Sequence, residues 1–315
     1  MTAGAGERER PAPLLMAYLV ALVAFGPLST DLYLPSLPAM VRDFGVTVSR
    51  AQLTLSGFLA GFALGMLAYG PLSDRFGRRP VLIGGIVVYI LASLLCIAAP
   101  SIEVLIGSRV VQGLGACSGP VIGRAVVRDL FDRAAAARTL SMMASAMALA
   151  PMVAPILGGW LQATVGWQGN FGVLLLFGLL VGGLTLAVLR ETNSRPDPTA
   201  LAPSRMAANY GRLLRDPVFL GYTLCVAFCY GGLFSFISGS SFAFIQVLGM
   251  APENFGFAFG AVVLGYVLGA YTSGRLGGRY GIENMVAVGA TVAVVGGVAL
   301  IAVAAGGAGS LPTVI

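Results

Sequence analysis

The stretch Gly70-Pro71-Leu72-Ser73-Asp74-Arg75-Phe76-Gly77-Arg78-Arg79-Pro80 is a short polar segment between two long apolar segments of the chain. Its last seven residues contain three arginines and one aspartate. Glycine lets the backbone turn tightly and lets helix ends approach one another closely. The stretch therefore predicts a charged cytoplasmic turn between two membrane-spanning helices.

The overall composition also indicates a membrane protein. Hydrophobic residues make up 57% of the 315 residues, charged residues only 10%, and the mean hydropathy is +0.88. This leaves too little polar surface to solvate a water-soluble globule of that length. The net charge of +6 comes from arginines in short patches between apolar runs, not from one exposed basic stripe. We therefore expect the lipid bilayer as a partner, and no nucleic acid.

Runs of about 20 apolar residues predict membrane-spanning helices. The chain contains nine of them, near residues 14–36, 51–72, 80–99, 102–124, 138–163, 170–190, 217–247, 255–275 and 285–306. The seventh is long enough to tilt or to break. The predicted fold class is all-α, a polytopic helical membrane protein.

The arginines predict the orientation of these helices. With the N-terminus inside, every arginine except Arg42, Arg50 and Arg109 lies on the cytoplasmic side. The first apolar run is a full-length span, and the tail before it has no short apolar core followed by a cleavage site. We expect a multi-pass protein of the plasma (inner) membrane with a cytoplasmic N-terminus and no signal peptide.

The chain also contains an internal repeat. Residues 65–82 align with residues 269–286 at an offset of 204, with identities at Gly65/Gly269, Gly70/Gly274, Leu72/Leu276, Arg75/Arg279 and Gly77/Gly281. The turns after the second and eighth spans therefore correspond, which predicts a recurring six-helix unit. The second copy has Gly278 where the first has Asp74, so any charge network at this turn is asymmetric.

The repeat predicts the domain organisation. Residues 1–190 form an N-terminal six-helix half, 191–216 a cytoplasmic linker with a short interfacial helix, and 217–315 three helices of a partial second half. A 6+6 arrangement needs twelve helices, so we expect a chain truncated after nine. Residues 310–315 would then open a tenth helix.

Two charged residues fall inside predicted spans. Asp31 lies in the first span and Arg109 in the fourth, and an ionised side chain in hydrocarbon usually persists only with a partner or a function. At 1.5 Å per residue, both lie roughly 5–10 Å below the outer surface. We expect them to pair or to couple through water, with Gln112 extending the Arg109 face. The alternative is that Asp31 extends to the outer interface beside Pro35.

The polar turn itself can carry a charge network. Asp74 is placed to cap the helix that follows and to pair with Arg78, and the Arg128-Asp129 pair at the end of the fourth span can extend the cluster. Such a cluster would latch one conformation and release it in another. The alternative is a turn that only sets the topology. The predicted gating residues are Gly70, Asp74, Arg75, Gly77, Arg78, Arg79, Arg128 and Asp129.

The fifth span combines helix-breaking and small residues. Pro151 and Pro155 remove two helix hydrogen bonds, and Gly158 and Gly159 allow a neighbouring helix to approach. A kinked, closely packed helix is expected, suited to blocking leak between states; plain helix packing is the alternative.

Catalytic and metal sites are not expected. The chain has no histidine, and its four cysteines all fall inside apolar spans. We predict no catalytic residues, no metal and no cofactor.

These motifs together resemble the major facilitator superfamily over nearly the whole chain. The 70–80 turn is similar to its loop signature, residues 109–113 to its fourth-helix signature, and residues 154–159 to its fifth-helix antiporter signature, with Ala154 where glycine is usual. Residues 26–38 and 128–130 look like the Bcr/CflA branch of drug:proton antiporters, known for bicyclomycin and chloramphenicol resistance. The resemblance implies a monomer that exports small drug-like molecules in exchange for protons by alternating access.

Asp31 is the only acid well inside a span, so we expect it to carry the coupling proton. Movement relative to Arg109 would switch it between loading and release. Substrate would compete for the same cavity, and its expected lining residues are Tyr33, Gln112, Tyr230, Phe234, Phe236 and Tyr266. A metabolite symporter or uniporter of the same superfamily remains an alternative. A non-transporting receptor or a membrane enzyme is the other, although neither a soluble domain nor a catalytic cluster is visible.

Overall fold

The computed structural model describes residues 13–305, so the expected N-terminal tail and the expected start of a tenth helix lie outside the described residues. Within that range, nine helical segments are long and apolar enough to cross a membrane, as the sequence predicts. The first span consists of α1 (Pro13–Asp31), the short 3-10 helix η1 (Leu34–Ser36) and α2 (Leu37–Phe44). The next five spans are α3 (Val48–Phe76), α4 (Arg78–Ile97), α5 (Ile102–Leu130), α6 (Arg133–Thr164) and α7 (Trp167–Val188).

A short helix and three further spans complete the described chain. These are α8 (Pro203–Leu213), α9 (Pro217–Ser241) with the π-helical segment η2 (Phe242–Val247), α10 (Pro252–Tyr280) and α11 (Ile282–Ala305). The long seventh apolar run is thus helical with a change of winding in its last turns. Irregular winding of this kind re-aims side chains within a helix.

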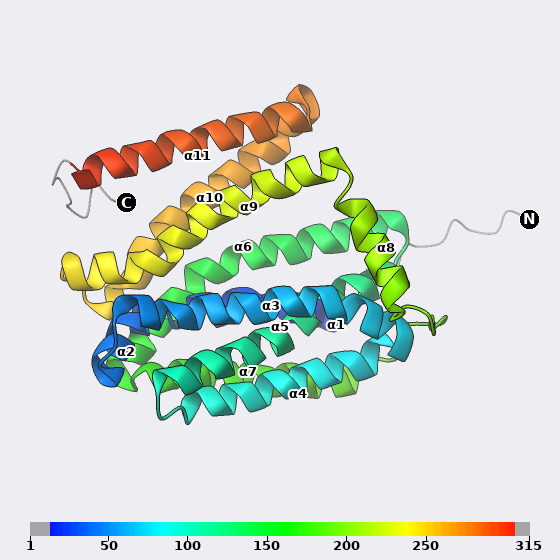
Figure 1. The fold of residues 1–315 in the computed structure, drawn as a ribbon, viewed down its shortest axis with the longest axis horizontal. Coiled ribbons are helices and arrows are strands. Elements are labelled where there is room, and N and C mark those ends of the chain that lie inside the picture. The colour runs from blue at the N-terminus through cyan, green and yellow to red at the C-terminus, as the bar shows by residue number, and fades with distance from the viewer. Residues whose placement is uncertain (1–12, 306–315) are drawn as a thin grey trace, which may run out of the picture.

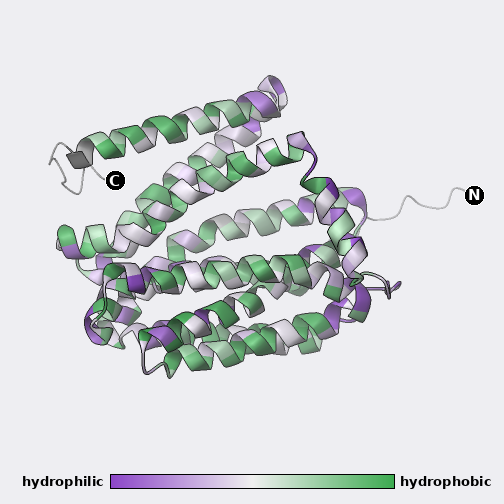
Figure 2. Ribbon diagram, viewed as in Figure 1, coloured by the Kyte–Doolittle hydropathy of each residue, from purple (hydrophilic) through white to green (hydrophobic). Residues whose placement is uncertain are grey.

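Polar residues fix where several spans begin. The side chains of Thr47, Ser101 and Asp132 each accept a hydrogen bond from the backbone N–H three residues later, at the first turns of α3, α5 and α6. Asp216 does the same for α9. Such caps satisfy backbone donors that have no partner inside the helix. The sequence thus alternates apolar spans with capped turns, as Figure 2 shows by the polar residues gathered at the helix ends.

The two ends of the bundle differ in charge. One end holds the turns at Gly77, Asp132 and Gly281 and the segment between α7 and α9, and we call it the arginine-rich end. The opposite end holds the turns at Gly45 and Gly249, and we call it the arginine-poor end.

Helices α1 to α7 form one bundle around α5, the most buried of the spans. Helices α9 to α11 form a second group beside it (Figure 1). The groups touch near the arginine-poor end, where Gln52 Nε2 of α3 donates to the Ser238 carbonyl of α9 at 3.1 Å. Towards the other end, α9, α10 and α11 diverge from the first bundle (Figure 1).

Helix α8 lies across the arginine-rich end (Figure 1). The segment leading to it is attached to α3, because the Asp197 N–H donates to the Asp74 carbonyl at 3.0 Å. Arg205 of α8 pairs with the Asp197 carboxylate, and the Tyr210 hydroxyl donates to the Leu67 carbonyl of α3 at 3.1 Å. The linker is therefore fastened to the first bundle at several points.

The internal repeat is visible in the backbone. Gly77 joins α3 to α4 with φ of 98°, and Gly281 joins α10 to α11 with φ of 82°. The helices end and begin at equivalent positions in the two copies at the offset of 204 residues. The same turn is thus built twice.

Candidate functional site

The first span is interrupted just after its buried acid. Helix α1 ends at Asp31, which is 4% exposed, and the chain resumes as a 3-10 turn at Leu34. The Asp31 carboxylate accepts a hydrogen bond from the Thr30 hydroxyl at 2.9 Å. Asp31 is therefore buried at a helix break, and does not extend to an interface.

Arg109 of α5 is fully buried and is held by oxygen atoms. Its Nη2 donates to the Ser29 carbonyl at 2.7 Å, its Nε to the Thr54 carbonyl at 3.4 Å, and its Nη1 to Gln112 Oε1. Its guanidinium carbon also lies 4.5 Å from the ring centre of Tyr33 and 4.4 Å from that of Phe58. Carbonyl dipoles and aromatic faces together offset the cost of the buried charge.

The expected ion pair between Asp31 and Arg109 is absent from this conformation. The structure joins them through the backbone instead, since Arg109 binds the Ser29 carbonyl two residues before Asp31. The carboxyl turns to Thr30 and the guanidinium to main-chain oxygens and Gln112. Asp31 and Arg109 thus contact the same end of α1 but do not contact each other.

Two residues expected to line the substrate cavity support Arg109 in this structure. Tyr33 stacks over the guanidinium and shares a hydrogen bond with Thr54 at 3.2 Å. Gln112 accepts from Arg109 and donates to the Ser93 hydroxyl at 2.8 Å. Both are fully buried, so they hold the guanidinium in place.

The aromatic residues expected on α9 and α10 divide into two sets. Tyr230 stacks on Phe234 at 6.3 Å, and it lies within electrostatic range of both Asp31 and Tyr266. Tyr230 is 52% exposed and Tyr266 is 59% exposed. Phe236 instead packs on a phenylalanine cluster with Phe244, Phe255 and Phe259. Tyr230 is thus the expected residue that the structure brings near Asp31, and Phe234 and Tyr266 are neighbours of Tyr230.

The two glycines of α6 lie between α1 and α10. A Cβ atom at Gly158 would collide with the Leu32 carbonyl in the break after Asp31. One at Gly159 would collide with the Pro252 carbonyl at the start of α10. Pro151 and Pro155 lie within the same helix, which runs unbroken over its 32 residues. The absence of side chains at these glycines allows α6 to approach closely both the end of α1 in its own bundle and the start of α10 in the second group.

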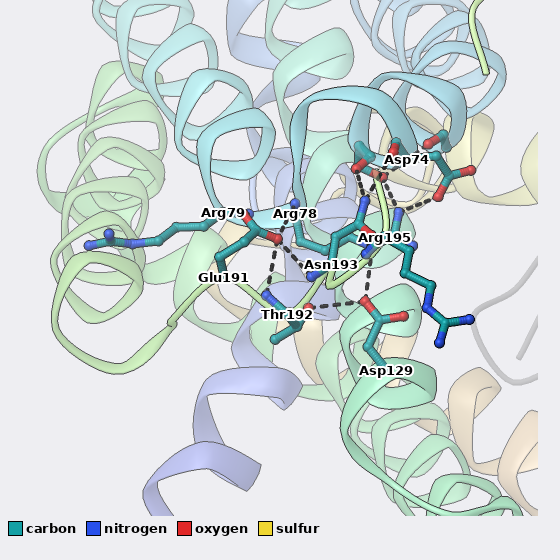
Figure 3. A network of polar contacts seen from close by, with 10 residues as sticks. Asp74, Arg78, Arg79, Asp129, Glu191, Thr192, Asn193 and Arg195 are labelled. Atoms are coloured by element: carbon teal, nitrogen blue, oxygen red, sulfur yellow. Dashed lines mark hydrogen bonds and ion pairs between the residues drawn. The ribbon is translucent and has the colours of Figure 1, made fainter. Parts of the chain in front are cut away.

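At the arginine-rich end, Arg78 is the centre of a polar network (Figure 3). Its Nη1 lies 2.5 Å from Asp74 Oδ1 and 2.7 Å from Ser73 Oγ, and its Nε lies 3.0 Å from Asp129 Oδ2. The pairing with Asp74 and the extension to Asp129 agree with the prediction from the sequence, whereas Ser73 is not among the predicted residues. These contacts join α3, α4 and α5.

The other residues expected in this network have different surroundings. Gly70 lies inside α3, and Arg128 lies in the last turn of α5. The Arg75 guanidinium lies 5.2 Å from the ring centre of Phe76, and Arg79 Nη2 donates to the Leu186 carbonyl at 3.2 Å. None of the four residues binds Arg78 in the described structure.

One expectation about this turn is wrong. Asp74 does not cap the following helix, because α3 continues through it to Phe76. The cap of α4 is instead provided by Glu191, which follows α7. Its carboxylate accepts hydrogen bonds from the N–H groups of Arg78 at 2.9 Å and Arg79 at 3.1 Å.

Sequence reasoning missed Glu191, Thr192 and Asn193. Thr192 donates to Asp129 at 3.0 Å, and Asn193 Nδ2 donates to the Asp74 carbonyl at 2.9 Å. The sequence signal that could have indicated them is the carboxylate of Glu191 and the amide of Asn193 directly after the sixth span.

The charge of Glu191 is stabilised by these contacts. Partial burial opposes its ionisation, but backbone N–H donors from Asn193, Arg78, Arg79 and Thr192 outweigh that cost. The pKa of Glu191 is therefore lowered below its ordinary value of 4.5. The carboxylate is the form that the turn requires at neutral pH.

Comparison with known sequences gives consistent matches. The family model described as Major Facilitator Superfamily matches residues 18–315. An uncharacterised MFS-type transporter, YdgK, of Bacillus subtilis is 37% identical over 270 residues, which cover 84% of this chain and 67% of that protein. A bicyclomycin resistance protein homologue of Haemophilus influenzae is 30% identical, covering 87% and 69% respectively. Multidrug resistance protein D of Escherichia coli is also 30% identical, covering 87% and 68%.

Solved structures share the fold at lower identity. A bacterial homologue of the human lysosomal transporter Spinster, in an inward-facing and occupied conformation, matches with a TM-score of 0.67 at 17% identity, covering 89% of this chain and 63% of that one. A D-xylose-proton symporter matches with a TM-score of 0.56 at 15% identity, covering 84% and 70%. The chain spans about two thirds of the length of the relatives it matches.

Proposed function

The chain belongs to the major facilitator superfamily, and from this membership we propose that it exports small drug-like molecules in exchange for protons by alternating access. Two of the relatives described above are named for drug resistance, which supports this substrate class. The family comprises transporters, not enzymes, and its members handle small molecules in the membrane.

The observation that carries the proposal is the buried Asp31 at the break between α1 and η1. An acid in this position can accept a proton without leaving an uncompensated charge in the membrane. Arg109 is held by its hydrogen bond to the carbonyl of Ser29, which lies two residues before Asp31. A small movement of the chain at the break between α1 and η1 would therefore change the distance between the Asp31 carboxyl and the Arg109 guanidinium. In this proposal Asp31 carries the coupling proton and Arg109 favours its release.

Substrate would bind between the two groups of helices, close to this acid. Tyr230, Phe234 and Tyr266 supply aromatic surface there, and both tyrosines are more than half exposed. Aromatic faces suit flat, apolar or cationic molecules. A proton on Asp31 would disfavour a bound cation, which is a direct basis for exchange.

The charge distribution supports an orientation for the proposed cycle. Arginines cluster on the cytoplasmic side of membrane proteins, so the arginine-rich end is assigned to the cytoplasm, in the plasma membrane with the N-terminus inside. The helix groups diverge at that end and meet at the other (Figure 1). We assign this arrangement to the inward-facing state of a monomer. Residues 1–190 are proposed as its first half, 191–216 as its linker and 217–315 as part of its second half.

The test is an efflux assay in a bacterial host that lacks its own drug pumps. Cells producing the protein are loaded with ethidium or chloramphenicol, and retention is followed with and without a protonophore. Protonophore-sensitive loss of either probe supports the proposal. Accumulation driven by an inward proton gradient would indicate a symporter instead, and retention equal to that of empty cells for every probe would contradict export.

A further inference from the structure

The first residues of the linker contact both helix ends that meet at Gly77. Glu191 binds the N–H groups of Arg78 and Arg79, which open α4. Asn193 Nδ2 donates to the carbonyl of Asp74 at 2.9 Å and to that of Ser73 at 3.3 Å, both in the last turn of α3 (Figure 3). A single short segment therefore satisfies acceptors of one helix and donors of the next.

Helix α4 has no side-chain cap from the residues at its own N-terminus. Its N-cap residue is Gly77, which has no side chain to offer, and the first N–H groups of a helix otherwise lack partners. A carboxylate at a helix N-terminus is also favoured by the helix dipole. Glu191 therefore does for α4 what Thr47, Ser101 and Asp132 do for α3, α5 and α6 from within their own segments.

Gly77 is shaped to receive this carboxylate. Its φ of 98° and ψ of 155° belong to a region almost restricted to glycine. A Cβ atom there would lie 2.6 Å from Glu191 Oε2. At the equivalent Gly281, φ is also positive but no described atom lies within 4 Å of the added Cβ. The positive φ explains why glycine is needed at both turns. Of the two glycines, Gly77 is the one whose missing Cβ leaves room for a carboxylate.

The same segment is connected to the side chain of Arg78. Asp129 Oδ2 accepts from Arg78 Nε and from the Thr192 hydroxyl, both at 3.0 Å. Arg78 is thus held by its backbone on Glu191 and by its side chain on Asp74 and Asp129. The linker thus binds the Arg78 backbone directly and contacts its side-chain partner Asp129 through Thr192.

We propose that Glu191 and Asn193 are positioning residues of the gate at the arginine-rich end: together they cap the Gly77 turn from both sides and aim Arg78 at Asp74 and Asp129. This inference rests on the proposed alternating-access function. It assigns the start of the linker to the gate itself. A purely structural role, in which the two residues only fasten the linker, predicts no effect on the conformation of the gate.

The test uses the purified protein in lipid nanodiscs and two measurements that need no substrate. Hydrogen exchange is followed for the peptide that contains the Arg78 and Arg79 amides. The distance across the arginine-rich end is measured between spin labels at Ala134→Cys and Glu283→Cys, in a background without native cysteines. The variants are Glu191→Ala, Asn193→Ala and the milder Glu191→Gln. The matched control is Glu103→Ala, which removes an exposed carboxylate from the first turn of α5 at the other end.

Loss of a charge-assisted hydrogen bond should raise exchange at Arg78 and Arg79 roughly ten-fold in Glu191→Ala, with a smaller rise in Glu191→Gln. Because the network is intact in this splayed structure, the distance distribution should shift towards the shorter, closed population in both alanine variants. Glu103→Ala should change neither measurement.

Unchanged exchange would overturn the cap, and faster exchange with an unchanged distance distribution would overturn the positioning role. If Glu191→Ala does not fold, Glu191→Gln and Asn193→Ala decide the question by the same two measurements. A parent protein that exports no probe would contradict the proposed function, while both measurements would still decide this inference.

Discussion

The Nη2 atom of Arg109 lies 2.7 Å from the carbonyl oxygen of Ser29, in the last turn of α1 before Asp31. This bond links the central helix of the first bundle to the break in the first span. It leaves the Asp31 carboxyl with the Thr30 hydroxyl as its side-chain partner among the described residues. The buried cation is thus anchored to the backbone, and it does not pair with the nearby acid.

Replacing Arg109 by lysine should destabilise the protein by about 2 kcal/mol, because an ammonium group cannot reach all three oxygens and lacks the planar guanidinium that lies near the rings of Tyr33 and Phe58. The loss of stability is measured by thermal unfolding in detergent, with the reactivity of the buried cysteines as the signal for unfolding. Arg50→Lys is the control, since Arg50 forms an exposed ion pair with Glu103 that contributes little. Equal midpoints for the two variants would contradict this account of Arg109.

Replacing Asp31 by asparagine should leave insertion and folding intact while removing pH-driven efflux, since the amide cannot take up a proton. Proteoliposomes with an imposed pH gradient measure the effect, and the rate should fall to that of empty vesicles. Asp43→Asn is the matched control, because Asp43 is exposed beyond the break and accepts from Trp167 Nε1. Efflux at the parental rate from Asp31→Asn would refute the proton-carrying role.

Gly158→Ala should cost about 1–3 kcal/mol of stability, because the added methyl group meets the Leu32 carbonyl and forces α6 away from α1. Gly172→Ala is its control in the neighbouring helix α7, where an added methyl meets no atom within 4 Å. That control should be neutral or slightly stabilising, since alanine favours a helix over glycine. Comparing the two unfolding midpoints checks the prediction, and a Gly158→Ala midpoint at or above that of Gly172→Ala would contradict it.

Asp74→Asn should weaken the hold on Arg78 and shift the balance between open and closed forms at the arginine-rich end. Single cysteines placed at the two ends of the bundle should then react with maleimide at changed relative rates. Asp216→Asn is the control at the same end, since Asn caps a helix about as well as Asp. Unchanged labelling together with unchanged efflux would leave the turn only a role in topology.

The cap by Glu191 should depend on pH in a defined direction. Its pKa is lowered in the folded protein, so its stabilising contribution is complete above its ordinary value of 4.5 and is lost as pH falls through the lower folded value. Exchange at Arg78 and Arg79, corrected for intrinsic rates, should be constant from neutral pH down to about 5 and should accelerate below 4.5. Glu191→Gln should abolish this acceleration of exchange below pH 4.5. An acceleration of equal size in that variant would show that another group is responsible for it.

The membrane spans were predictable because the bilayer sets their length and excludes charge from their interior. The contact between Asp74 and Arg78 was predictable as well, since a tight turn between two spans keeps an acid and an arginine four residues apart at the same end of the bundle. Asp129 could be added because its span ends on the same side of the membrane. These inferences needed only local spacing and the common plane of the membrane.

Other contacts could not be read from spacing. The carboxylate of Glu191 and the Arg78 amide are 113 residues apart, and the partner is a main-chain N–H that every residue but proline carries. The Ser29 carbonyl that binds Arg109 is likewise a backbone group. Phe236 shares a helix with Tyr230, yet its rotation about α9 directs it to the phenylalanine cluster. Such outcomes depend on tertiary packing.

The attachment of the linker to α3 has a practical consequence for dissecting the molecule. Asp197 and Tyr210 both bind backbone carbonyls of α3, so the chain is fastened to the first bundle as far as α8. A two-fragment co-expression experiment should therefore break the chain after Leu214, in the short connection between α8 and α9. A fluorescent protein or an affinity tag inserted at the same point would spare every anchor, whereas an insertion between Glu191 and Asp197 would separate them.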